Sequence, residues 1–202
     1  MLKEAIVICQ PKDLPSTFIN ELEEKLDKPD FKIKIIKTEN PGPYAAIEWA
    51  IPTLIIAYLL KPFFETFLQE AGKDFYKLTK SELKKFILSV RKIKAKYIAS
   101  SESPDKISRN YDQSITISLK AKIHEKLNIT VLFNKNIPDE EADEILEAMV
   151  EILSLLYVEC QKVDQNEINK NQRINNVYLI SNNQIKKWEI FTEQQMFERY
   201  KN

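Results

Sequence analysis

The feature that most constrains this chain is an apolar run from Tyr44 to Leu60, which contains one charge, Glu48, and one proline, Pro52. The rest of the chain is polar: 30% of its 202 residues are charged, and its 30 basic and 30 acidic side chains balance. Water disfavours exposed apolar surface, so the run must be covered. The fold therefore has to provide a core, a partner or a lipid surface for this segment.

Length and cysteine content narrow the class of protein. A chain of 202 residues can bury a substantial core, and we expect one domain over residues 1–202. Cys9 and Cys160 lie in apolar segments, where a free cysteine behaves as a small buried apolar residue. Free cysteines are typical of a reducing compartment. The N-terminus has no long apolar stretch of the kind that marks a secretory signal. We therefore expect a cytoplasmic protein, and the abundance of Lys, Asn and Ile suits a bacterial source.

Several kinds of site are excluded by composition. The chain has only two glycines, Gly42 and Gly72, so it cannot build the glycine-rich loops that cradle phosphates. His124 is the only histidine, and with two widely separated cysteines it cannot form a usual zinc site. We expect neither a metal nor another cofactor.

The first part of the sequence predicts a strand, a helix and a second strand. Residues 4–10 are apolar and β-branched, and Phe18, Ile19, Leu22 and Leu26 then recur at helical spacing. Residues 31–37 alternate between apolar and basic side chains. This order is typical of two parallel strands joined by a right-handed crossover.

The middle of the chain shows no convincing strand alternation. We predict a helical insert over about residues 44–100, almost uniformly apolar in its first half and amphipathic in its second. Pro52 and Pro62 can stand at helix starts or at kinks.

The last ninety residues predict two hairpins, each followed by a helix. Residues 115–123 and 129–133 alternate strictly, and residues 177–180 and 185–191 form a second pair of short strands. An amphipathic helix begins at Pro138, and Thr192 with Gln195 resembles a capping box before a short C-terminal helix. The fold class is therefore α+β: a mixed sheet built from a β-α-β unit and two β-hairpins, with helices mainly on one face and the helical insert between the halves.

Two segments carry opposite charge. Residues 77–96 hold eight basic side chains and one acid, and residues 139–151 hold seven acids and no base. Two helix faces that attract each other within the fold would account for this pattern. A docking face for an acidic or phosphate-rich partner is the alternative, and Tyr97 and Tyr111 could then stack on single-stranded nucleic acid. Because the whole chain is neutral, we do not expect nucleic acid as a partner. The basic patch comprises Lys84, Lys85, Arg91, Lys92, Lys94 and Lys96.

The apolar run has three interpretations: a core helix, an interface with another chain, or a membrane contact. Its seventeen residues are short for a bilayer, and Glu48 and Pro52 are unfavourable in one. The interface interpretation includes the aromatic residues that follow the run. Its candidate interaction residues are Trp49, Ile51, Leu54, Ile55, Tyr58, Phe63, Phe64 and Phe67.

One cluster could carry catalysis. Glu70, Lys73 and Asp74 fall on one side of a helix, where crowded carboxylates beside a lysine could move protons or hold a metal. The same spacing is typical of a solvated salt-bridge ladder.

The sequence therefore predicts a non-catalytic protein that binds another protein or a second copy of itself through the apolar helical insert. Two alternatives are a protein that exposes the apolar helix to a membrane and an enzyme that uses Glu70, Lys73 and Asp74.

Overall fold

The computed structural model describes residues 4–12, 14, 17–26, 28–29, 31–39, 53–69, 73–93, 112–134, 136–162, 175–182 and 187–200. The strands are β1 (Glu4–Pro11), β2 (Lys32–Thr38), β3 (Ile55–Leu59), β4 (Gln113–His124), β5 (Leu127–Asn134), β6 (Asn175–Asn182) and β7 (Lys187–Thr192). The helices are α1 (Thr17–Leu26), α2 (Lys61–Gln69), α3 (Asp74–Arg91), α4 (Asp139–Lys162) and α5 (Glu193–Tyr200). The fold is α+β, as predicted.

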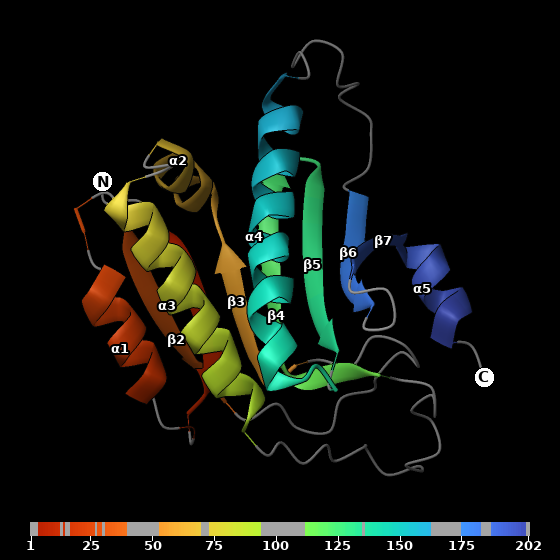
Figure 1. Cartoon of the computed structure of the whole chain (residues 1–202), viewed down its shortest axis with the longest axis horizontal. Helices are drawn as coiled ribbons and strands as arrows, with labels where there is room; N and C mark the ends of the chain where they lie inside the picture. The colour runs from red at the N-terminus through yellow and green to blue at the C-terminus, as the bar shows by residue number, and fades with distance from the viewer. Residues whose placement is uncertain are drawn as a thin grey trace.

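All seven strands form one mixed sheet in the order β2-β1-β3-β4-β5-β6-β7 (Figure 1). The predicted β-α-β unit is confirmed, because β1 and β2 pair in parallel. Both predicted hairpins are confirmed as well, because β4 pairs antiparallel with β5 and β6 pairs antiparallel with β7. Two further parallel pairs, β3 with β4 and β5 with β6, each enclose helices in the chain order.

The expected all-helical insert is wrong in its first half. Residues Ile55–Leu59 form strand β3, which lies between β1 and β4 near the middle of the sheet. A short apolar run between two prolines fits a buried strand as well as a helix, and here two neighbouring strands satisfy its backbone groups. The second half of the insert is helical, as predicted, and contains α2 and α3. Residues 40–52, with Trp49 and Ile51, lie outside the described residues.

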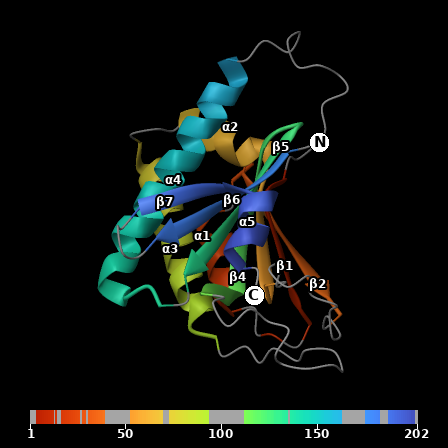
Figure 2. The same ribbon diagram turned by 90° about the vertical axis from the view of Figure 1, so that its right-hand side faces the viewer.

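Four helices cover one face of the sheet. Figure 1 shows α3 in front of β2 and α4 in front of β4, with β6 and β7 beside α4. The fifth helix is on the other side, since Figure 2 shows α4 and α5 on opposite sides of β6. The predicted capping box at the start of α5 is confirmed: the Thr192 N–H donates to Gln195 Oε1 at 2.8 Å, and the Gln195 N–H donates to Thr192 Oγ1 at 3.3 Å.

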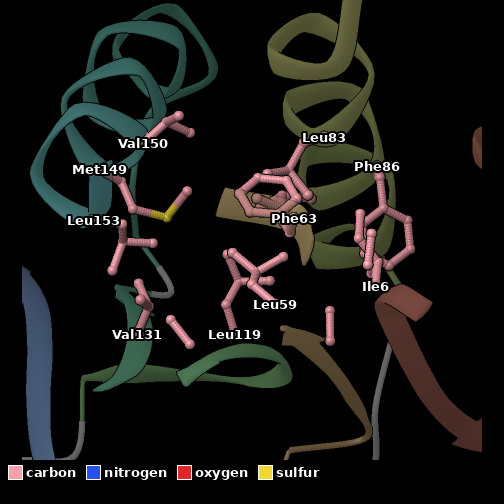
Figure 3. Packing of buried hydrophobic residues seen from close by; sticks show 14 of the residues in the cluster. Ile6, Leu59, Phe63, Leu83, Phe86, Leu119, Val131, Met149, Val150 and Leu153 are labelled. Atoms are coloured by element: carbon pink, nitrogen blue, oxygen red, sulfur yellow. The ribbon is translucent and has the colours of Figure 1, made fainter. Parts of the chain in front are cut away.

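The core lies between the sheet and the four helices. In Figure 3, Leu59 and Leu119 point from the strands toward Phe63 and Leu83, and Leu153 lies above Val131. Aromatic rings pack against one another beside this cluster, both within α2 and between elements. The ring pairs include Phe31 with Phe75 at 5.3 Å, Phe63 with Phe67 at 5.3 Å and Phe64 with Tyr157 at 4.8 Å.

We predict that Leu59→Ala lowers the free energy of unfolding by about 2–5 kcal/mol, because Leu59 is 1% exposed and its loss would leave a cavity in the core. Leu155 on α4 is 64% exposed, so the matched control Leu155→Ala should cost no more than about 0.5 kcal/mol. Urea denaturation followed by circular dichroism measures both. Equal effects would contradict the placement of β3 in the core.

Candidate functional site

Of the six predicted interaction residues that the structure describes, four belong to the chain's own core. Ile55, Phe63, Phe64 and Phe67 are buried beneath the helices, so they offer no surface to a partner in this structure. Leu54 and Tyr58 are half-buried on or next to β3. The cover that the apolar run requires is therefore provided by the sheet and its helices over the described part of the run.

The two charged segments neutralise each other across the α3–α4 contact. The Lys80 ammonium pairs with Glu147 and also lies 3.7 Å from a carboxylate oxygen of Glu151. One turn further along α3, Lys84 pairs with Asp143 at 3.1 Å. These contacts agree with the interpretation that the two helix faces attract each other within the fold, and they leave less of the basic patch for a partner.

A second set of ion pairs joins α3 to α1. Glu82 on α3 is only 7% exposed and accepts hydrogen bonds from Lys25 at 3.1 Å and Lys85 at 2.7 Å. Burial alone would raise the pKa of Glu82, but the hydrogen bonds and charges of the two lysines outweigh it and lower that pKa. Lys85 is therefore engaged by a buried acid, and Arg91 donates to the Ile137 carbonyl at 2.6 Å.

The remaining sequence candidates do not meet in a described site. Lys73 and Asp74 are exposed at the start of α3, and Glu70 lies outside the described residues, as do Lys94 and Lys96. Lys92 follows the end of α3. In the ranges that the structure describes, no group of three or more His, Cys, Asp or Glu side chains could hold a metal ion. Among the described helices, none combines the length and the apolar character needed to cross a bilayer.

A row of residues on the side of the sheet opposite the four helices, where α5 contacts β6 and β7, forms the most distinctive surface. Residues that stand opposite one another on neighbouring strands form a row across the sheet. All side chains of one row point to the same face of the sheet. The row through Leu119 and Val131 is buried beneath the helices, and the next row therefore faces the other way. That row, which we call the Tyr58 row, takes one residue from each strand: Lys34, Val7, Tyr58, Lys120, Thr130, Tyr178 and Phe191.

The Tyr58 row combines aromatic rings with lysines and contains no carboxylate. The Lys120 ammonium lies 5.7 Å from the centre of the Tyr58 ring. Burial raises the pKa of both Tyr58 and Tyr178, so both phenols are neutral near pH 7. Two rows further toward the β4–β5 turn, on the same face of the sheet, stand Lys122, Asn128 and Asn176, which add a second cation and two amides.

A polar network at the other end of the same face holds α5 in place. The Tyr200 hydroxyl donates to Asp112 Oδ1 at 2.7 Å, and Gln113 Nε2 donates to the same oxygen at 2.6 Å. Asp112 Oδ2 accepts from Asn134 and Arg199, each at 3.3 Å. The Arg199 guanidinium also lies 5.2 Å from the centre of the Phe191 ring. The network fixes the C-terminal helix across the ends of β4 and β5.

Sequence reasoning missed both the Tyr58 row and the network around Asp112. The row extends in sequence from Val7 to Phe191 and the network from Asp112 to Tyr200, and only the tertiary fold brings their members together. A register is not readable from alternation alone, because alternation fixes which residues share a face within one strand and not which strands are neighbours.

Comparison of the chain with protein-family models, with curated protein sequences and with solved structures finds no match. Its function must therefore be inferred from these surfaces.

We predict that Tyr200→Phe weakens the dependence of stability on alkaline pH. Burial, followed by the hydrogen bond and the charge of Asp112, raises the pKa of Tyr200 above its ordinary value of about 10. Above pH 10 the unfolded chain loses this proton first, so the stability that Tyr200 contributes is full below about pH 10 and is lost as the pH rises further.

Urea denaturation at pH values from about 7 to 11 measures the effect. The variant should be less stable at pH 7 by about 1–3 kcal/mol, because Asp112 loses a donor, and it should lose less stability as the pH rises. Parallel profiles for the wild type and the variant would contradict the role of the neutral Tyr200 hydroxyl.

Proposed function

We propose that this protein is a non-catalytic association protein, and that its contact is the open edge of β7, where a second copy of the chain adds to the sheet. The observation that carries the proposal is the exposure of Ile190: it belongs to the row that is buried beneath the helices, yet it is 53% exposed. The apolar row runs past α4 and ends on the outermost strand.

The two edges of the sheet differ in how they are protected. Edge strands carry unpaired backbone groups, and lysines on such strands discourage further pairing. Among its seven residues β2 has three lysines, Lys32, Lys34 and Lys37. The sequence of β7, KWEIFT, has a single lysine at its first position and aromatic or apolar residues at three others. Of the two edges, β7 is therefore the one suited to receive another strand.

The sequence of β7 is also suited to pair with itself. Self-pairing about a two-fold axis centres on one residue, because side chains alternate between faces. Centring on Glu189 would oppose two carboxylates, which is unfavourable. Centring on Ile190 instead buries this residue against its own copy and brings Lys187 toward Glu193 of the second chain. Burial of each exposed isoleucine contributes up to about 1.5–3 kcal/mol, in addition to backbone hydrogen bonds.

The sequence also predicts an association protein, but it places the contact surface in a different part of the chain. The sequence assigned association to the apolar insert, and the described part of that insert is core. The enzyme alternative loses support because Lys73 and Asp74 are exposed at the start of α3, and the described residues contain no group of three or more His, Cys, Asp or Glu side chains that could hold a metal. The membrane alternative loses support because Ile55–Leu59 is a strand within the sheet.

Free thiols at Cys9 and Cys160 support the proposed cytoplasmic location, and the bacterial source rests on composition.

We predict that the wild type forms a dimer at about 100 µM, the concentration range in which a single strand pair contributes measurably. Ile190→Lys should give a monomer, because it places a charge at the centre of the paired edge. Light scattering after size-exclusion chromatography measures both masses.

The matched control is Leu155→Lys, which adds the same charge at an exposed leucine of α4. It should remain a dimer with an unchanged thermal unfolding midpoint. A monomeric wild type, or loss of the dimer in the control alone, would overturn the proposal.

A further inference from the structure

We infer that the Tyr58 row is a binding site for single-stranded nucleic acid. This surface lies on the face opposite the four helices, and it goes beyond the proposed self-association at the β7 edge. It also differs from the charged helix that the sequence singles out, because three lysines of that helix, Lys80, Lys84 and Lys85, are engaged by acids of α4 and by Glu82. The argument rests on charge, on ring placement and on polar groups beside the rings.

The charge of the row is one-sided. Lys34, Lys120 and Lys122 project from the same face, and the Tyr58 row holds no acid from β2 to β7. Lys34 is bonded to Glu4, whereas neither Lys120 nor Lys122 forms an ion pair within the part of the chain that the structure describes. Two ammonium groups without acidic partners on a sheet face attract phosphates, even though the net charge of the chain is zero.

Two tyrosine side chains, Tyr58 and Tyr178, lie in the same row with Lys120 between them. Tyr58 and Tyr178 are three strands apart in one row, which corresponds to about 14 Å at the usual strand spacing of about 4.8 Å. Both side chains are half-buried, so their rings are supported by the sheet and still reach solvent. Lys120 stands between them and can meet a phosphate while bases stack on the rings at either side.

Amides extend the site to the next row on the same face of the sheet. Asn128 Nδ2 donates to Asn176 Oδ1 at 3.3 Å, and Lys122 is opposite Asn128 on β4. Amide groups can exchange this mutual bond for hydrogen bonds to the edges of unpaired bases. The site is bounded at β7 by Glu189 and by Glu193, whose negative charge acts on Tyr178.

A single strand fits this surface better than a duplex or an acidic peptide. Flat rings gain most from bases whose faces are free, and a duplex hides those faces. An acidic peptide would use the lysines and leave the tyrosines without planar partners. We therefore expect contact with two or three unpaired nucleotides across β3 to β6.

The test is fluorescence anisotropy with a labelled oligothymidine of about 15 nucleotides at about 50 mM salt, using the full chain. The wild type should bind, and its affinity should fall as salt rises. Lys120→Glu combined with Lys122→Glu should weaken binding by about tenfold or more. Tyr58→Leu and Tyr178→Leu should each weaken it by at least about fivefold, because the apolar contact with the sheet remains and the ring is lost.

The matched control is Lys61→Glu, which reverses an exposed charge on α2, outside the Tyr58 row. It should bind as the wild type does, and so should Ile190→Lys, so that failure of the proposed dimer and failure of this site are separate results. Thermal unfolding verifies that each variant is folded.

Three results would overturn the inference. The first is that the folded wild type does not bind the oligothymidine at about 100 µM protein. The second is that Lys61→Glu loses as much affinity as the variant with both lysines replaced. The third is that a duplex or a polyglutamate peptide binds as tightly as the oligothymidine, or more tightly.

Discussion

The pairing of β3 with β1 and β4 is the interaction on which the rest of the structure depends. Without β3, no strand pairing would join the β-α-β unit at the N-terminus to the four-stranded part that begins at β4. The five residues of β3 alternate between buried and half-buried. Ile55, Ala57 and Leu59 belong to the core, and Tyr58 lies on the opposite face of the sheet. The strand that closes the sheet thus also supplies the first ring of the Tyr58 row.

Local patterns predicted most of the elements, and tertiary context decided the one that failed. Strict alternation identified β4 and β5, and Thr192 with Gln195 marked the start of α5, because these signals are carried by neighbouring residues. Residues 55–59 carry no such signal, since a short apolar run suits a helix or a buried strand equally. Only the free edges of β1 and β4 select the strand. The Tyr58 row was unpredictable for the same reason.

Charge balance in this protein is local as well as global. The acids of α4 lie against Lys80 and Lys84 of α3, and Glu82 joins α3 to α1 through Lys25. A run of lysines in the sequence therefore does not define a basic surface, because its partners come from another segment. Isolated exposed pairs contribute little to stability, but Glu82 is buried, and removal of both lysines would leave an uncompensated charge. These pairs orient the helical layer over the sheet.

The two proposed surfaces follow from one register and remain chemically separate. Rows alternate between faces, so Ile190 belongs to the face of the helices, whereas its neighbour Phe191 ends the Tyr58 row on the opposite face. With the pairing centred on Ile190, the row beneath the helices would continue into its own copy, whereas Phe191 would oppose Glu189 of the second copy. The aromatic and basic residues of the two chains would then lie on one continuous face. The two Tyr58 rows would remain separate on that face, because Glu189 of each chain would stand at the end of the other chain's row, so loss of self-association should leave each nucleic-acid surface intact.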